Sequence, residues 1–270
     1  MLSMDLVKRY PVAVFFGASV SIGWFVTIAA ARLPGATALL PLVAIPVSYV
    51  PAAAALAVLR VTGTEDDRRA LRRRLTTVRV DARWYAVALL VPPLVHLSGV
   101  ALATLAGGTF AIQPAMFALL PLFLITSLGE EIGWRGYAQP KLQERMTPLA
   151  AAIVVGLVWA AFHWVALLAN AETPLAYVIV STFQLMALSI ILAILFNKGR
   201  QALILVVLAH AMYDTASVGV APFASTGVPL VAFALSAVVT WVVAIGMLVV
   251  LGQLQSRALP SEATPRPAGG

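Results

Sequence analysis

The sequence predicts an all-α polytopic membrane protein, with residues 1–270 forming a single transmembrane domain. Of its 270 residues 61% are hydrophobic and only 11% are charged, and the mean hydropathy is +0.95. Soluble globular domains carry about 25% charged residues, so this composition excludes that class. Apolar stretches of about 20 residues, long enough to cross a bilayer as a helix, recur along the whole chain.

Eight of these stretches are predicted to be transmembrane helices. Their approximate bounds are residues 11–31, 36–59, 85–105, 114–138, 148–168, 175–196, 201–220 and 228–251. The first follows basic residues, as the core of a cleaved signal peptide would. It exceeds the usual core of about 7–15 residues, so we interpret it as an uncleaved helix. Pro41, Pro46 and Pro51 predict kinks in the second helix, and Pro140 predicts the end of the fourth.

The distribution of basic residues predicts which side of the membrane each loop occupies. If loops alternate from a cytoplasmic N-terminus, every one of the 18 Lys and Arg residues except Arg32 falls on the cytoplasmic side. Membrane proteins concentrate Lys and Arg in cytoplasmic loops. Eight helices with both termini in the cytoplasm satisfy this rule, whereas seven or nine would mix the charges. Residues 252–270 are then a flexible cytoplasmic tail.

Residues 60–83, between the second and third helices, are predicted to form a basic amphipathic helix on the membrane surface. Thr64 and Asp67 have the spacing of a capping box, which marks a helix start. Arginines on one face oppose an apolar face of Leu71, Leu75 and Val78. We interpret this segment as a topology-setting cytoplasmic loop; the alternative is a binding site for lipid head groups or nucleic acid. With a net charge of +7, we expect the lipid bilayer, and no nucleic acid, as the anionic partner.

Two adjacent carboxylates, Glu130 and Glu131, lie in the fourth predicted helix with Arg135 close behind. An ionisable side chain at the centre of a membrane helix costs about 2.5–3.5 kcal/mol by insertion scales. Glu131 and Arg135 are i,i+4 neighbours and can therefore form an ion pair. Arg135 could instead hold a carboxylate of a substrate. Glu130 points about 100° away along the helix and is left for another partner, which makes it the first candidate for chemistry.

Two further predicted helices carry costly polar groups. His163 lies in the fifth, and His210 lies in the seventh with Asp214 four residues later on the same face. The fourth, fifth and seventh helices would bring these groups to one cavity if they pack together. Packing alone does not explain so many ionisable groups in a membrane. His96, isolated among Val and Leu, is interpreted as an interhelical hydrogen-bond partner.

The aromatic residues around His163 are predicted to be packing residues. Trp159, Phe162 and Trp164 are interpreted as facing lipid or the core, although Trp159 shares the face of His163 and could line the same cavity. The chain contains no cysteine, which excludes disulfides, thiolate metal sites and cysteine nucleophiles.

These residues form three ordered motifs. They are Glu130-Glu131-x-x-x-Arg135, the aromatic residues followed by His163, and His210-x-x-x-Asp214. The set resembles the CAAX protease and bacteriocin-processing family of intramembrane proteases, and the block from Gly129 to Gln143 resembles its bacterial members closely. The resemblance spans residues 79–216. It implies eight membrane helices, and Asp214 is the acidic variant of a position that is often Asn in the family.

The resemblance implies hydrolysis of a peptide bond in a membrane-associated peptide or protein. Glu130 would act as general base on a water molecule, with Glu131 and Arg135 as its oriented partners. His163 and His210 would donate hydrogen bonds to the developing oxyanion. Alternatively they would bind Zn²⁺ or another divalent metal together with Asp214, a set that leaves a position open for water. The sequence leaves the metal and metal-free mechanisms both open.

Two other functions remain compatible with the sequence. Chains of Glu, His and Asp across a helix bundle also form proton relays, so a proton-coupled transporter is one alternative. Transporters usually show repeated halves, and no internal repeat is found here. The other alternative is an immunity or scaffold protein that keeps the fold without catalysis; the intact motifs argue against it. All three functions place the protein in the cell membrane.

Overall fold

The computed structural model describes residues 4–32, 43–105, 114–168, 174–220 and 230–251. Within these ranges the regular structure is entirely helical. Pro41 and the tail of residues 252–270, for which the sequence predicted a kink and a flexible segment, lie outside the described residues.

The described helices follow the predicted segments closely. They are α1 (Met4–Arg9), α2 (Pro11–Ala31), α4 (Val50–Thr62), α5 (Glu65–Thr76), α6 (Ala82–Leu105), η1 (Pro114–Leu119), α7 (Leu120–Gly133), η2 (Trp134–Ala138), α8 (Gln139–Gln143), α9 (Pro148–Leu168), α10 (Leu175–Lys198), α11 (Leu203–Val220) and α12 (Leu230–Leu251).

Among the described residues, seven helices are long and apolar enough to cross a membrane. They are Pro11–Ala31, Val43–Thr62, Ala82–Leu105, Phe117–Gln143, Pro148–Leu168, Leu175–Lys198 and Leu230–Leu251. The chain is a multi-pass membrane protein. The predicted seventh crossing is the exception, because its apolar helix, α11, is shorter than the others. The count of eight crossings therefore stays a prediction.

The second membrane helix is interrupted, as its prolines predicted. Residues 43–48 are helical, Tyr49 forms a turn, and α4 starts anew with Pro51 in its first turn. Proline is accommodated there because the first amide groups of a helix need no partner within it.

Two glycines of α7 pack directly on this interruption. A Cβ atom added to Gly129 would lie 2.6 Å from Cδ2 of Tyr49, and one added to Gly133 would lie 2.5 Å from Cβ of Pro51. Only glycine permits such contact. This close packing of small residues fixes the part of α7 that carries the two carboxylates.

A stretch of π-helix follows α7 directly. Residues Trp134–Ala138 form this stretch, η2, and α8 continues through Pro140 to Gln143. The predicted helix end at Pro140 is therefore wrong. The proline stands in the first turn of α8, where its missing amide hydrogen is tolerated. Such single π-turns inside α-helices are frequent at functional sites.

The basic segment forms helix α5, but only part of its predicted apolar face is buried. The predicted capping box of Thr64 and Asp67 is present. Leu71 is buried, whereas Leu75 is 40% exposed and Val78 lies beyond the end of the helix and is 57% exposed. The helix instead docks through Arg74, whose guanidinium donates to the Gly136 carbonyl and to the Gln201 side chain, each at 3.0 Å. Burial, followed by the neighbouring Arg73, lowers the pKa of Arg74 to about 10.

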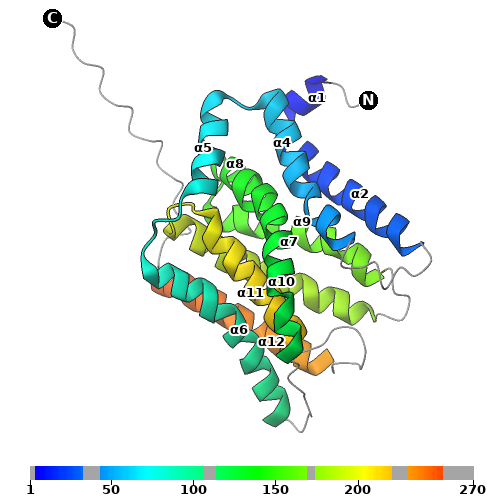
Figure 1. Ribbon diagram of the computed structural model, residues 1–270, viewed down its shortest axis with the longest axis vertical. Coiled ribbons are helices and arrows are strands. Elements are labelled where there is room, and N and C mark those ends of the chain that lie inside the picture. The colour runs from blue at the N-terminus through cyan, green and yellow to red at the C-terminus, as the bar shows by residue number, and fades with distance from the viewer. Residues whose placement is uncertain (1–3, 33–42, 106–113, 169–173, 221–229, 252–270) are drawn as a thin grey trace, which may run out of the picture.

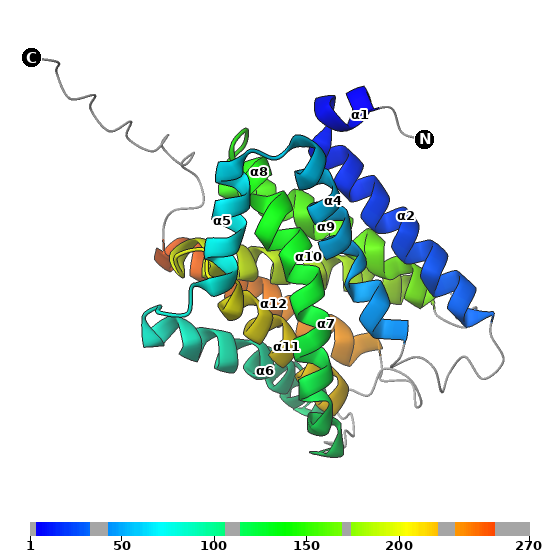
Figure 2. The ribbon, with the colours of Figure 1, turned by 45° about the horizontal axis from the view of Figure 1, so that its top comes forward.

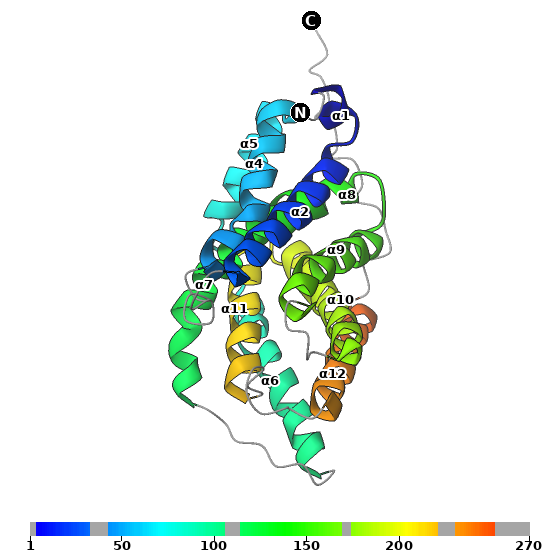
Figure 3. The same ribbon diagram turned by 90° about the vertical axis from the view of Figure 1, so that its right-hand side faces the viewer.

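α7 lies between α4 and α11 in the view of Figure 1 and along one edge of the molecule in the view of Figure 3. It packs against α4 on one side and α11 on another, and α11 also packs against α6. α9 packs against both α10 and α2, and Figure 2 shows α2 lying along α4 at the edge of the molecule. The elements that carry the candidate site, α7, η2, α9 and α11, therefore meet in the interior.

His96 on α6 lies in the core. It is 3% exposed and packs against the ring of Tyr213, with ring centroids 4.5 Å apart. Among the described residues its Nε2 has no hydrogen-bond partner. The interhelical hydrogen bond predicted for His96 is therefore not found at Nε2, and the described interhelical contact is the packing of its ring on Tyr213.

Candidate active site

Glu130 and Glu131 are both buried, at the end of α7 just before the π-helical stretch. Arg135 stands one turn later on η2 and is also fully buried. A buried charge is costly unless it is paired and hydrogen-bonded. The partners of these three side chains come from α9, α10 and α11, as the following contacts show.

Glu130 is held by two tryptophans. Its Oε2 accepts a hydrogen bond of 2.7 Å from the indole Nε1 of Trp159 on α9 and a longer one of 3.4 Å from that of Trp134. Both indoles are buried. Its other oxygen, Oε1, lies 4.0 Å from Nε2 of His163. One carboxylate oxygen is thus anchored, and the other faces a histidine.

Glu131 joins two helices through a single oxygen. Its Oε1 accepts from Nη1 of Arg135 at 2.8 Å and from Nδ1 of His210 at 2.9 Å. The first contact is the predicted i,i+4 ion pair. The second ties α7 to α11. Glu131 therefore fixes the position of His210 as well as that of Arg135.

Arg135 is fixed from three directions. Besides Glu131, its Nη2 donates to Oγ of Ser189 at 3.1 Å, and that hydroxyl donates in turn to the Ala152 carbonyl at 2.8 Å. The guanidinium carbon lies 4.7 Å from the ring centroid of Trp159, a cation–π contact. The planar guanidinium thus connects α7 to α9 and α10.

The hydrogen bonds of the two histidines assign their protons. Nδ1 of His163 lies 2.9 Å from the carbonyl oxygen of Trp159, which can only accept, so Nδ1 carries the hydrogen. The same reasoning applies to Nδ1 of His210 beside the Glu131 carboxylate. In the neutral form of each ring, Nε2 therefore presents a lone pair. The predicted donation to an oxyanion would require a positively charged ring.

Exposure distinguishes an open side of the site from a closed one. The side chains of Glu131 and Arg135 are 0% exposed and that of His210 is 3% exposed. The His163 side chain is 36% exposed and that of Asp214 is 31% exposed. A substrate could reach the site from the side of His163 and Asp214, next to the 9% exposed Glu130.

The predicted metal ligands do not gather into one cluster. His210 Nε2 lies 3.4 Å from Asp214 Oδ2, whereas Nε2 of His163 faces Glu130. Among the described residues, no group of three or more His, Asp or Glu side chains has a geometry that could hold a metal ion. The site as it stands does not fit a three-ligand zinc centre. Zinc binding stays a prediction.

The six residues predicted for the site thus lie together, although their catalytic roles remain predictions. Sequence reasoning missed Trp134 and Ser189, and it treated Trp159 chiefly as a packing residue. Trp134 is the i,i+4 neighbour of Glu130, so its hydrogen bond was open to the spacing argument that paired Glu131 with Arg135. No sequence pattern connects Ser189 to Arg135, which precedes it by 54 residues.

Comparisons with known proteins agree with this site. Residues 111–216, which hold all three motifs, match the model of the type II CAAX prenyl endopeptidase Rce1-like family. Residues 111–216 are thus similar to CAAX prenyl endopeptidases, in agreement with the resemblance carried by the three motifs. A related sequence is CAAX prenyl protease 2 of Methanococcus maripaludis, 24% identical over 151 residues. That match covers 50% of this chain and 56% of the relative, so the chain is matched to about half the length of that protein.

Proposed function

We propose that this protein is an intramembrane endopeptidase that hydrolyses a peptide bond of a membrane-associated peptide or protein. The observation that carries the proposal is the arrangement of Glu130. One of its oxygens is anchored by Trp159, and the other is 4.0 Å from Nε2 of His163 on the open side of the site. A base held in this way beside an accessible polar partner is what activation of water requires.

The gap between Glu130 and His163 matches the needs of one water molecule. Glu130 Oε1 and the neutral Nε2 of His163 are both acceptors. A water molecule has two hydrogens and can donate one to each across the 4.0 Å separation. Its lone pairs then point away from both residues, toward a substrate carbonyl. In this arrangement His163 orients the water, and Glu130 receives its proton.

The reaction follows from that geometry. The water oxygen attacks the scissile carbonyl carbon as its proton passes to Glu130 Oε1. When the carbon–nitrogen bond breaks, Glu130 returns this proton to the leaving nitrogen, and the carboxylate is regenerated. Glu131, Arg135 and His210 take no proton in this scheme. Their hydrogen bonds keep α7 and α11 in place around the reacting groups.

We further propose a prenylated C-terminal peptide as the substrate class, because the related archaeal protein is named a CAAX prenyl protease. Two synthetic peptides with the same sequence, one farnesylated and one unmodified, test both halves of the proposal. Cleavage is followed by mass spectrometry with the full chain in lipid nanodiscs. Glu130→Gln keeps the size of the side chain but removes the base, so cleavage should fall by about 10²–10⁴-fold.

The matched control is Glu65→Gln, the same chemical change at a 61% exposed site on α5. It should leave cleavage unchanged. Wild-type turnover by Glu130→Gln would refute the proposed base. Equal cleavage of the two peptides would refute the prenyl preference and leave the hydrolase in place. Metal analysis of the same preparations tests the zinc prediction separately.

We also propose eight membrane crossings with both termini in the cytoplasm, with α11 as the short seventh crossing and α5 on the cytoplasmic surface. α11 has 18 residues, or about 27 Å at 1.5 Å per residue, slightly less than the hydrocarbon thickness of about 30 Å. Reporter fusions after Phe110 and Asn170 should lie outside, and fusions after Val78 and Thr147 should lie in the cytoplasm. A fusion on the opposite side would refute this topology.

A further inference from the structure

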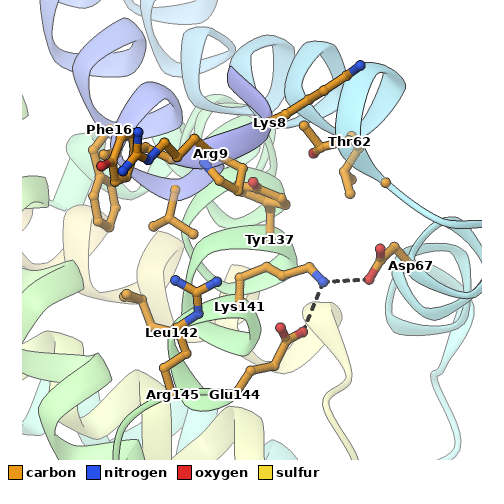
Figure 4. A pocket seen from close by; sticks show the side chains of 16 residues that line it. Lys8, Arg9, Phe16, Thr62, Asp67, Tyr137, Lys141, Leu142, Glu144 and Arg145 are labelled. Atoms are coloured by element: carbon orange, nitrogen blue, oxygen red, sulfur yellow. Dashed lines mark hydrogen bonds and ion pairs between the residues drawn. The ribbon is translucent and has the colours of Figure 1, made fainter. Parts of the chain in front are cut away.

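A cavity of about 440 Å³ lies away from the candidate active site, where α1, α2, α4 and α8 meet. Figure 4 shows its lining. α2 begins at Pro11, α4 ends at Thr62 and α8 ends at Gln143, so three membrane-crossing segments terminate around it. The cavity therefore lies where these helices leave the apolar layer. Lipid head groups occupy that level of a bilayer.

The cavity contains one satisfied cation. Lys141 pairs with Asp67 at 2.7 Å and with Glu144 at 2.9 Å (Figure 4). These are the two carboxylates among the residues that line the cavity. Both carboxylates are thus committed to one ammonium group.

Three further cations line the same cavity without such compensation. They are Lys8 and Arg9 at the end of α1 and Arg145 just after α8. Within the described part of the chain, none of the three forms an ion pair with a carboxylate; Arg9 lies over the ring of Tyr10, 5.3 Å from its centroid. The lining therefore has a surplus of positive charge that an anion would neutralise.

A buried hydroxyl provides a second, independent observation. Tyr137 of η2 lines the cavity and is only 3% exposed, and its hydroxyl has no hydrogen-bond partner among the described residues. Buried tyrosine hydroxyls usually find a partner. A phosphate oxygen in the cavity would accept its hydrogen bond.

We infer that this cavity binds the phosphate of an anionic glycerophospholipid. Lys8, Arg9 and Arg145 would neutralise the head group and Tyr137 would donate to it. The apolar side chains of Phe16 and Leu142, which also line the cavity, provide contacts for the glycerol and upper acyl carbons. The interfacial position and this mixed lining match a lipid better than a free anion. The site is independent of the proposed proteolysis, because binding is measured without a substrate.

The test is a titration of the full chain in detergent micelles, with binding counted by native mass spectrometry. Short-chain phosphatidylglycerol should bind more tightly than short-chain phosphatidylcholine. Each cation near a membrane surface strengthens the binding of an anionic lipid about 5-fold. Arg145→Gln should therefore weaken phosphatidylglycerol binding about 5-fold, and Lys8→Gln with Arg9→Gln about 25-fold. Tyr137→Phe should weaken it without lowering the unfolding temperature.

The charge-matched control is Arg73→Gln with Arg79→Gln. Both arginines are exposed, and neither lines this cavity. If the control variant loses as much affinity for phosphatidylglycerol as the cavity variants do, the effect comes from the overall positive charge of the protein, and the proposed site is refuted. Equal binding of phosphatidylglycerol and phosphatidylcholine would also refute it. Displacement of the lipid by millimolar inorganic phosphate would assign the cavity to a free anion instead. The single Arg145→Gln variant decides the question even if the double variant does not fold.

Discussion

Replacing Arg135 by lysine separates the charge of this residue from its shape. Lysine can keep the ion pair with Glu131. Its single ammonium group cannot also reach Ser189 while staying over the ring of Trp159, as the guanidinium does. The variant therefore loses one charge-assisted hydrogen bond and part of a cation–π contact, and it keeps the net charge of the interior.

The size of the effect follows from these contacts. A hydrogen bond to a charged group contributes about 1.5–3 kcal/mol in soluble proteins, and interhelical hydrogen bonds in membranes average about 0.6 kcal/mol. A desolvated cation–π contact adds about 2 kcal/mol, of which lysine retains part. We expect Arg135→Lys to lower the free energy of unfolding by about 1–4 kcal/mol. Cleavage should fall with it, because Glu131 and His210 lose a fixed neighbour.

Arg135→Met provides the comparison. It removes the positive partner and leaves the buried Glu131 carboxylate with His210 alone, a change that costs about 3–5 kcal/mol when a buried pair is broken. Reversible unfolding in mixed micelles should rank the stabilities as wild type, then lysine, then methionine. Arg73→Lys, at an exposed site on α5, should match the wild type. Equal stability of the lysine and methionine variants would show that only the charge matters and would refute the reasoning from shape.

Three further predictions concern neighbouring contacts. Trp159→Phe keeps an aromatic ring but removes the 2.7 Å hydrogen bond to Glu130. Because Glu130 loses its anchor, kcat/KM should fall about 10–100-fold. An unchanged kcat/KM would contradict the anchoring role of Trp159. Ser189→Ala cuts the link from Arg135 to α9 and should lower the free energy of unfolding by about 1–3 kcal/mol in micelles. Burial raises the pKa of Asp67, but hydrogen bonds from Lys141 and Thr64 outweigh it, so the pKa is lowered from 3.8. Because the pKa of Asp67 is lower in the folded chain than in the unfolded chain, its carboxylate stabilises the fold at a pH above the unfolded-state pKa. This stabilisation is lost as the pH falls through the folded-state pKa. Acid titration of unfolding should therefore show a loss below about pH 4 that Asp67→Asn lacks.

Local spacing predicted those parts of the protein that depend on one helix. The membrane helices follow from apolar length, and the Glu131–Arg135 pair and the capping box follow from i,i+4 and i,i+3 neighbours. What failed depends on the packing of several helices. Periodicity placed Leu75 on the apolar face of α5 toward the membrane, where it is exposed on the protein, but it could not show that the helix docks through Arg74. The end predicted at Pro140 was wrong because a π-turn precedes it.

The two adjacent carboxylates show how the site divides chemistry from structure. A buried carboxylate that pairs with a fixed cation is committed to that pair, because breaking the pair would leave an uncompensated charge. Glu131 is such a carboxylate, because its Oε1 accepts from both Arg135 and His210 and the pair with Arg135 is 0% exposed. Glu130 receives only neutral indole donors, and both act on the same oxygen. Its second oxygen, Oε1, faces His163 on the open side of the site and is thus the more available position. This asymmetry, built from neighbours on η2, α9 and α11, is the physical reason for assigning the role of base to Glu130 and a structural role to Glu131.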